Sequence, residues 1–117
     1  MIALHGDLRI FVATQPVDFR KGVNGLVALV AEALQSDPYG GDIFVFRSKR
    51  HDRLKMITYD GSGIVLVTKW LEVGRFTWPA IEDGAMRLSA AKMAMLVDGL
   101  DWLRVPQTAV KRPMKVG

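Results

Sequence analysis

The sequence predicts one α+β domain: an antiparallel sheet of four to five strands, one helix packed on a face of the sheet, and a second, C-terminal helix. Three observations predict this fold. A short alternating apolar segment is followed by a long apolar stripe with helical spacing, and several segments rich in β-branched and aromatic residues come next. A second helical pattern then ends near residue 103, so residues 8–103 are expected to form the domain and residues 104–117 a basic, mobile tail.

The first strand is expected at residues 8–13, where apolar residues alternate. A helix is expected at about residues 19–35, with Asp18 as its N-cap, because a carboxylate accepts hydrogen bonds from the unpaired amides of a first turn. The apolar stripe of this helix consists of Val23, Leu26, Val27, Val30, Ala31 and Leu34. Gly22 and Gly25 fall inside the expected helix, where each costs about 1 kcal/mol relative to alanine. They predict a close approach of the helix backbone to the sheet.

Further strands are expected at residues 43–46, 54–59, 64–71 and, as a short fifth strand, 76–78. The turn sequence at residues 60–63 (DGSG) joins two of them as a hairpin, since glycine adopts the positive φ that tight turns need. Consecutive strands joined by short turns pair in antiparallel fashion. Ser89 is the expected N-cap of the second helix, whose apolar positions are Met93, Leu96, Val97 and Leu100.

Composition excludes several classes of protein. The chain has 117 residues and no cysteine, which excludes disulfides, thiolate metal sites and cysteine nucleophiles. No apolar run approaches the roughly 20 residues of a membrane span. The first residues lack the pattern of a secretory signal. The expectation is a cytoplasmic, bacterial protein that makes no membrane contact.

The net charge of +4 is concentrated in two short blocks. The first has one anion, Asp52, among five cations: Arg47, Lys49, Arg50, Arg53 and Lys55. The second has no anion and four cations: Arg104, Lys111, Arg112 and Lys115. The rest of the chain is net acidic. Concentrated positive charge indicates a nucleic acid or an acidic protein surface as partner.

The first basic block is expected to form a loop between two antiparallel strands, with Arg53 and Lys55 on the same strand face. Such a ribbon can follow a phosphate backbone. The alternative is a solvated loop whose charges limit aggregation of the apolar strands beside it. Arg20 and Lys21 oppose the dipole at the expected helix start, which suggests a phosphate contact or an ion pair with Asp18. Downstream aromatic residues can stack on bases, but core packing is favoured for all three: Trp70, Phe76 and Trp78.

Nothing in the sequence predicts catalysis or a cofactor. His5 and His51 lie in an expected terminus and a cationic loop, and neither has a recognisable triad partner. No phosphate-binding glycine motif is present. Several carboxylates have simple interpretations as caps or turn residues, namely Asp18, Asp37 and Asp60. A metal nuclease would need converging carboxylates, which the sequence does not indicate.

Several motifs occur in an order that resembles the TnpB accessory proteins of the insertion-sequence-66 transposon family. They are residues 16–22 (PVDFRKG), 44–47 (FVFR), 52–55 (DRLK), 60–63 (DGSG) and 74–79 (GRFTWP). Residues 88–89 (LS) and 100–102 (LDW) resemble the closing helix of that family, so the resemblance covers about residues 10–105. One departure is residues 57–59 (ITY), where relatives carry larger aromatic residues.

The resemblance implies a protein that works beside a separate DDE transposase, with no catalytic residues to carry over. Combined with the charge map, it leads to the hypothesis of a non-enzymatic accessory protein that binds transposon-end DNA. The residues expected to contact DNA are Arg47, Lys49, Arg50, Arg53, Lys55, Lys111 and Arg112. The alternative is a protein–protein adaptor that contacts the transposase without binding DNA, and a nuclease subunit is a third, less favoured hypothesis.

Overall fold

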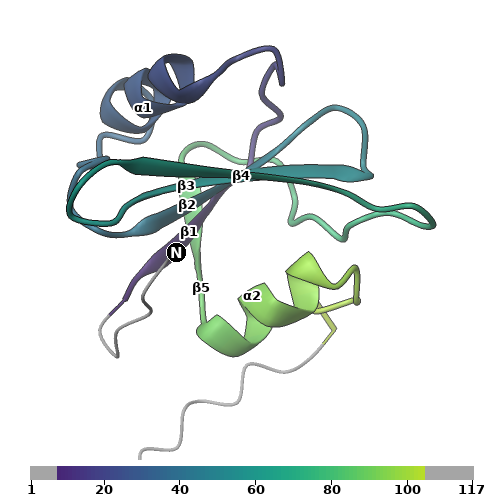
Figure 1. Ribbon diagram of the computed structural model, residues 1–117. Coiled ribbons are helices and arrows are strands. Elements are labelled where there is room, and N and C mark those ends of the chain that lie inside the picture. The colour runs from purple at the N-terminus through teal and green to yellow at the C-terminus, as the bar shows by residue number, and fades with distance from the viewer. Residues whose placement is uncertain (1–7, 105–117) are drawn as a thin grey trace, which may run out of the picture.

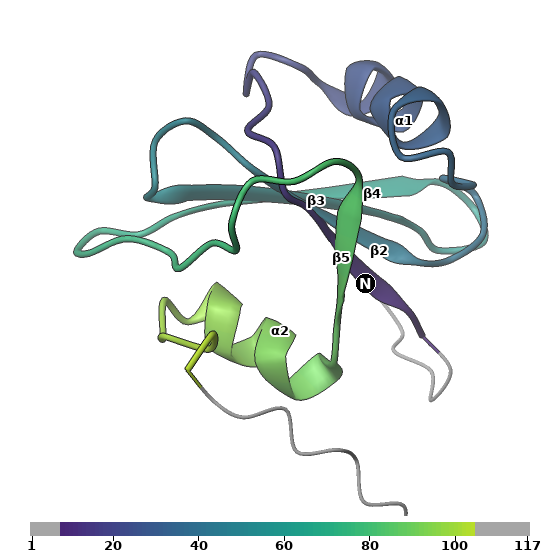
Figure 2. The ribbon, with the colours of Figure 1, turned by 180° about the vertical axis from the view of Figure 1, so that it is seen from behind.

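The structure, a computed structural model, describes residues 8–104. In chain order its elements are β1 (Ile10–Ala13), α1 (Val23–Glu32), β2 (Ile43–Arg47), β3 (Arg53–Tyr59), β4 (Ile64–Trp70), β5 (Ala85–Leu88) and α2 (Ala90–Val97). The strands form one five-stranded sheet, with α1 on one face and α2 on the other (Figures 1 and 2). The predicted α+β class is therefore confirmed. Among the described residues, neither helix has the length and apolar character needed to cross a membrane.

The strand order is β4-β3-β2-β1-β5, and the sheet is mixed rather than wholly antiparallel. The pairs β2/β3, β3/β4 and β1/β5 are antiparallel, as expected, but β1 and β2 are parallel. The physical reason is the connection between them. Because α1 carries the chain back across one sheet face, β2 begins at the same end of the sheet as β1.

The fifth strand is not where the sequence predicted it. Residues 76–78 have no regular structure, and the edge strand β5 instead pairs with β1, with Val12 opposite Met86. Phe76 and Trp78 are nevertheless buried. The irregular backbone around them is held by Trp102, whose indole Nε1 donates to the Thr77 carbonyl at 2.7 Å. The apolar character of Phe76 and Trp78 therefore indicates that they are buried in the core, and it does not indicate a strand conformation.

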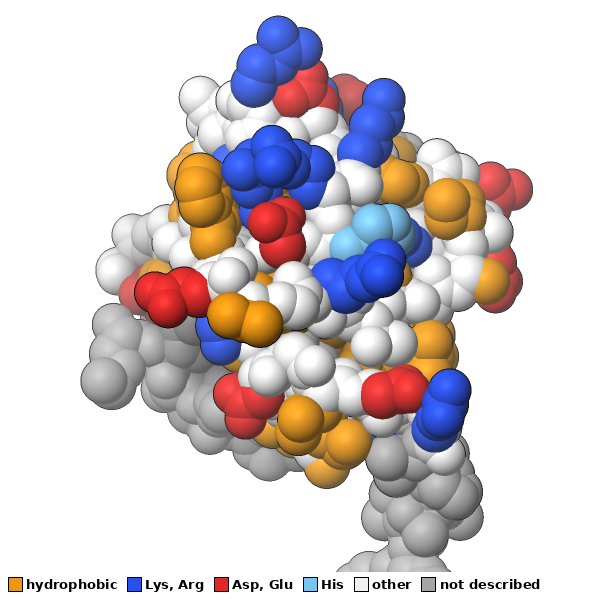
Figure 3. All heavy atoms as spheres, turned by 90° about the vertical axis from the view of Figure 1, so that its right-hand side faces the viewer, with side chains coloured by type: hydrophobic (Ala, Val, Ile, Leu, Met, Phe, Trp, Pro, Cys, Tyr) orange, Lys and Arg blue, Asp and Glu red, His pale blue; other side chains and the backbone are white. Residues whose placement is uncertain are grey.

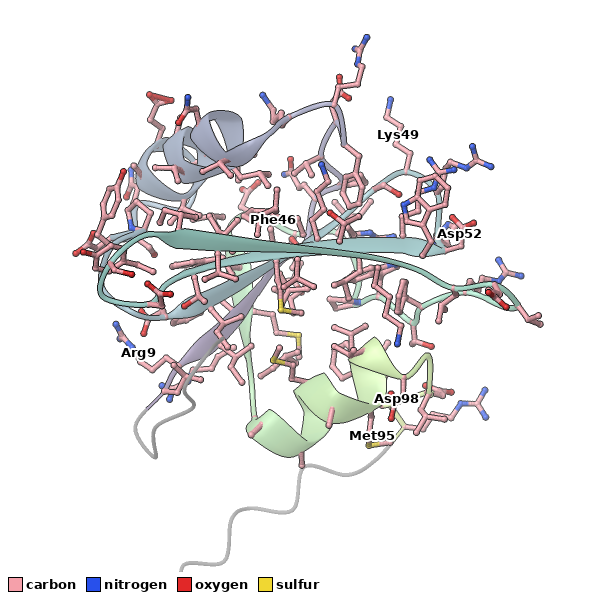
Figure 4. All side chains as sticks on the ribbon, viewed as in Figure 1. Arg9, Phe46, Lys49, Asp52, Met95 and Asp98 are labelled. Carbon is pink, nitrogen blue, oxygen red and sulfur yellow. The ribbon has the colours of Figure 1, made fainter. Side chains whose placement is uncertain are left out.

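The sheet separates two apolar cores, one under each helix. Along β2, Phe44 and Phe46 belong to the core under α1, whereas Ile43 and Val45 belong to the core on the α2 side. Figure 4 shows Phe46 on the α1 side of the sheet. A strand covered on both faces reads as a continuous apolar run. Each such fully buried side chain contributes about 1.5–3 kcal/mol to stability.

Helix α1 begins four residues later than the Asp18 cap predicted. Gly22 is its N-cap and forms no side-chain capping bond. Asp18 closes a separate turn, in which its carbonyl accepts from the Lys21 amide at 3.0 Å. A Cβ at Gly25 would meet side-chain carbons of Lys21 at 3.2 Å, and no sheet atom is as close. The predicted close approach of helix and sheet at these glycines is therefore wrong.

Two local predictions are confirmed. The Ser89 hydroxyl caps α2 by accepting from the Lys92 amide at 3.1 Å. The turn between β3 and β4 contains Gly61 with φ +101°, a conformation that L side chains rarely adopt. Asp60 stabilises this turn, because its carboxylate accepts from the amides of Ser62 and Gly63 at 2.9 and 3.0 Å.

Candidate nucleic-acid interface

An open groove of about 710 Å³ lies on the α1 face of the sheet, beside the chain that leads into α1. One wall is that chain, residues 16–20, and the opposite rim is the β2–β3 loop. The floor is formed by residues of β3 and β4. The residues that line the groove are Pro16, Val17, Asp18, Phe19, Arg20, Ser48, Lys49, Arg50, Arg53, Lys55, Thr68 and Trp70. We call it the basic groove.

Strand alternation sets the floor of the basic groove. Ile57 lies in the core under α1, and the side chains of Lys55 and Arg53 follow on the same face of β3 at period two. On β4 the register places Trp70 opposite Arg53 and Thr68 opposite Lys55. The prediction that Arg53 and Lys55 share a strand face is confirmed.

Lys55 joins the floor to the wall. Its ammonium donates to the main-chain carbonyls of Phe19 at 2.8 Å and Lys21 at 3.1 Å. The Nζ atom also lies 5.1 Å from the centre of the Phe19 ring, within the range of a cation–π contact. Lys55 thus adds positive charge to the groove and holds the wall in place.

The wall contains the ion pair of Asp18 and Arg20, with 2.7 Å between Oδ2 and Nη2. Hydrogen bonds from the Arg20 side chain, and then from its amide, hold the pKa of the Asp18 carboxyl well below its ordinary value. The same pairing raises the pKa of Arg20. The ion pair was one of two roles that the sequence suggested for Arg20. Because the Arg20 side chain is 91% exposed and the Asp18 side chain 48% exposed, the ion pair adds little to the stability of the fold.

The rim presents two free cations. The Ser48 hydroxyl donates to the Arg50 carbonyl at 2.5 Å and accepts from the Arg50 amide at 3.0 Å, which closes a tight turn. Lys49 and Arg50 are exposed on this turn, and Figure 4 shows Lys49 pointing away from the sheet. Within residues 8–104, neither side chain has a hydrogen bond or an ion pair. Both cations are free to meet an anion.

Trp70 and Arg53 form a stacked pair on the floor. The guanidinium carbon of Arg53 lies 4.0 Å from the centre of the Trp70 ring. Trp70 is 63% exposed, the highest exposure among the tryptophans, since Trp78 and Trp102 are buried. The nearest carboxylate to Arg53 is Asp52, at 3.8 Å from Nε, and Arg53 Nε makes no hydrogen bond within the described part of the chain.

Arg47 lies outside the basic groove, on the opposite face of the sheet. It is 7% exposed, and its Nη1 donates to the carbonyls of Pro79 at 3.1 Å and Thr14 at 3.4 Å. Its guanidinium lies 5.5 Å from the Trp78 ring centre. Burial lowers the pKa of Arg47. The alternation of side chains along a strand could have indicated this position of Arg47, because Phe46 and Arg47 are consecutive residues of one strand and point to opposite faces.

Sequence reasoning was wrong about one member of the site, Trp70, which it assigned to the core and which is 63% exposed in the groove. For Arg20 the sequence suggested a phosphate contact or an ion pair, but Arg20 was not included among the residues expected to contact DNA. Trp70 ends β4 opposite Arg53, and Arg20 lies in the segment before α1, so only the folded arrangement brings both residues to the groove. Lys111 and Arg112, also expected to contact DNA, lie outside the described residues.

The electrostatic character of the basic groove is strongly positive. Its lining has one carboxylate, Asp18, and five cations: Arg20, Lys49, Arg50, Arg53 and Lys55. Figure 3 looks onto this end of the molecule and shows Lys and Arg side chains gathered in its upper half. Over residues 8–104, no three His, Asp or Glu side chains converge as they would to hold a metal ion. The arrangement favours the binding of a polyanion.

Comparison with known proteins gives the relationships of the chain. Two proteins of Sinorhizobium fredii are similar to it and are themselves described as uncharacterized: y4jC is 61% identical over 99% of both chains, and y4hO is 43% identical over 95% of both. No solved structure is significantly similar. A model of the family described as IS66 Orf2-like protein matches residues 8–107. The chain therefore belongs to the IS66 Orf2-like family, whose role is an accessory one associated with transposition.

Proposed function

We propose that this protein is a non-enzymatic accessory factor of bacterial DNA transposition that binds DNA through the basic groove and assists a separate transposase. The observation that carries the proposal is the excess of cations in the groove, five against a single carboxylate that is already paired with Arg20. The family supplies the biological context, transposition. The groove supplies a surface suited to a phosphate backbone.

The proposed contacts differ in what each side chain is free to do. Lys49 and Arg50 are exposed and unpaired among the described residues, so they meet phosphates without giving up another interaction. Arg53 lies deeper: its side chain is 23% exposed, and its Nε is buried without a hydrogen-bond partner among the described residues. Lys55 contributes positive electrostatic potential and no direct phosphate contact, because its ammonium is already hydrogen-bonded to two carbonyls. Arg47 is left out of the contact set, since it is buried on the other face. The tail residues Lys111 and Arg112 remain part of the proposal.

Phosphate contacts of this kind fix position and do not read sequence. Each phosphate neutralised on duplex DNA releases about 0.9 counterion, so affinity falls with salt in proportion to the number of contacts. The proposal therefore predicts binding to transposon-end DNA that weakens steeply as salt is raised. It also predicts little preference between sequences.

The test is a titration of the purified protein against transposon-end DNA and, separately, against the transposase, at several salt concentrations. The variant K49A/R50A should bind all duplexes more weakly, with a log–log salt slope shallower by about two, since each lost contact accounts for about 0.9. The matched control is R75A/R87A, which removes two exposed arginines that do not line the groove. It should leave the slope close to that of the wild type.

The adaptor hypothesis is the contrary outcome of the same test. If the wild type shows no salt-dependent DNA binding at low ionic strength and still captures the transposase, DNA binding is overturned. The cations of the groove would then meet an acidic surface of the transposase. In that case K49A/R50A should weaken the capture of the transposase, and R75A/R87A should not.

A further inference from the structure

Trp70 is a large aromatic residue left in solvent at the end of β4. At 63% exposure it forgoes most of the stabilisation that burial of an indole provides, whereas Trp78 and Trp102 are 8% and 0% exposed. The Trp70 ring is held in place, because the guanidinium carbon of Arg53 lies 4.0 Å from the ring centre and β3 pairs with β4 at this position. An ordered, solvent-facing aromatic ring inside a cationic groove is an arrangement suited to a planar ligand.

The surroundings of the stacked pair supply the rest of a nucleotide site. Lys49 and Arg50 lie on the rim of the same groove and have no partner within residues 8–104, so they are available for phosphate oxygens. The Arg53 side chain lines the same groove and is 23% exposed. Bases of unpaired strands stack on aromatic rings and on guanidinium planes, and the phosphates between them follow a positively charged groove.

We propose that the basic groove binds an unpaired DNA strand, with a base stacked on the Trp70–Arg53 pair and the flanking phosphates at Lys49 and Arg50. This inference rests on the proposed DNA-binding function and names the form of DNA that the groove prefers. Arg53 has two roles in it. Its planar guanidinium enlarges the surface on which a base can stack, and its positive charge attracts the phosphate backbone of the DNA.

The dimensions of the groove favour an unpaired strand over a duplex. A volume of about 710 Å³ falls within the range of about 300–1,000 Å³ that is usual for sites of small ligands. Individual nucleotides enter such a space, whereas a duplex can only lie across its opening. In a duplex the base faces are also covered by their neighbours, so a ring on the groove floor cannot reach them unless the base leaves the stack.

The preference for single-stranded DNA should depend little on the base sequence, because every base has a flat face that can stack on an aromatic ring. Phosphate contacts at the rim are open to duplex and single strand alike. Only the stacking contact distinguishes the two forms. A loss of Trp70 is therefore expected to weaken the binding of single-stranded DNA and to leave the salt slope of duplex binding unchanged.

The experiment titrates the full-length protein with a single-stranded oligothymidylate of about 12 nucleotides, a length within the site sizes usual for such grooves, and with a duplex of equal length. Tryptophan fluorescence should be quenched by the single strand, because Trp70 is the exposed indole.

W70A should lose on the order of tenfold in single-strand affinity, the size expected when one stacked base is lost, and should lose the quenching. W70Y, which keeps an aromatic ring, should recover most of the affinity. V73A, at another exposed apolar residue of the following loop, is the matched control and should bind as the wild type does.

A second variant separates the plane of Arg53 from its charge. R53K keeps the cation and removes the flat guanidinium, so single-strand affinity should fall while the salt slope stays the same. Circular dichroism and the thermal midpoint establish that each variant is folded.

The inference is overturned if the duplex binds as tightly as the single strand, if W70A and W70Y lose affinity equally, or if W70A weakens both forms of DNA to the same degree. In those cases a flattened salt slope of K49A/R50A on duplex DNA would still support the proposed function. If neither form of DNA binds at low ionic strength, the inference and the DNA-binding function fail together.

Discussion

The Nζ of Lys55 lies 2.8 Å from the carbonyl oxygen of Phe19, so a side chain of β3 determines where the chain before α1 lies over the sheet. A second bond, to the Lys21 carbonyl at 3.1 Å, secures the same segment. Lys55 therefore helps to set the opening of the basic groove, through main-chain acceptors 34 and 36 residues away in the chain, together with the Val17 amide, which donates to the Arg47 carbonyl at 2.8 Å.

The first prediction follows from this contact. Lys55→Met keeps the length of the side chain and removes the ammonium, so the two carbonyls lose their donor. The free energy of unfolding should fall by about 1.5–3 kcal/mol, the usual contribution of a hydrogen bond to a charged group. Urea denaturation measures it. The matched control is Lys49→Met, an exposed residue without a partner in the described part of the chain, which should stay within about 0.5 kcal/mol of the wild type. Equal effects of the two substitutions would contradict the tethering role of Lys55.

A second prediction contrasts two neighbouring cations of the basic block. Arg47→Ala should destabilise the protein by about 2 kcal/mol or more, because buried carbonyls of Pro79 and Thr14 lose a charged donor and packing against Trp78 is lost. Its effect on the salt slope of DNA binding, compared at a temperature where the variant is folded, should be negligible. Lys49→Ala should do the reverse, with unchanged stability and a slope shallower by about 0.9. A reduced slope for a folded Arg47→Ala variant would show that Arg47 reaches the DNA after all.

The third prediction concerns pH and the β3–β4 turn. Hydrogen bonds from the amides of Ser62 and Gly63, and from the Ser62 hydroxyl, lower the pKa of Asp60 in the folded protein. A carboxyl whose folded pKa lies below its unfolded value, about 3.9, stabilises the fold above that value. Its contribution is lost as the pH falls below about 4 toward the folded pKa.

Asp60→Asn removes this titration, so the stability of the variant should decline less than that of the wild type between neutral pH and pH 3. Thermal midpoints measured across that range provide the comparison. Asp18 titrates with the same sign and is unchanged in both proteins. Two curves that run parallel through the acid range would contradict the role assigned to the Asp60 carboxylate.

The fourth prediction tests the domain boundary that the sequence suggests. Trp102 is fully buried and donates to the Thr77 carbonyl, so the core extends at least to that residue. Deleting the chain from Pro106 onward should leave the thermal midpoint nearly unchanged. If Lys111 and Arg112 contact DNA, the same deletion should make the duplex salt slope shallower by about two. A large fall in the midpoint would place part of the fold beyond residue 105.

The elements that the sequence predicted well are those whose signal is local. The Ser89 cap needs only an oxygen at the correct offset from the Lys92 amide, and the glycine-rich turn at residues 60–63 needs only a residue that accepts positive φ. The shared face of Arg53 and Lys55 follows from the period of a strand. Each of these is decided within a few residues of chain, so the order of residues is sufficient.

Other features depended on neighbours that are distant in the chain. β5 is an edge strand of only four residues, too short for its alternation to stand out in the sequence. It pairs with β1, more than seventy residues away in the chain, because β1 offers a free edge. Phe76 and Trp78 carry the residue types of a strand, yet their burial comes from packing beside Trp102 in irregular backbone. Apolar residue types indicate that a segment is buried. Whether its backbone forms a strand depends on the segments that pack against it.

The sequence by itself determined the α+β class, the two helices, the hairpin and the concentration of positive charge between residues 47 and 55, because periodicity, caps, turns and charge are properties of short segments. Only the tertiary structure decided which of those charges act together. Folding turned Arg47 inward beside Trp78, bound Lys55 to the chain before α1, and brought Arg20 and Trp70 to the same groove as Lys49 and Arg50. The physical reason is that a site is a set of distances between side chains, and those distances are set by which strand faces and turns pack together, not by the order of residues along the chain.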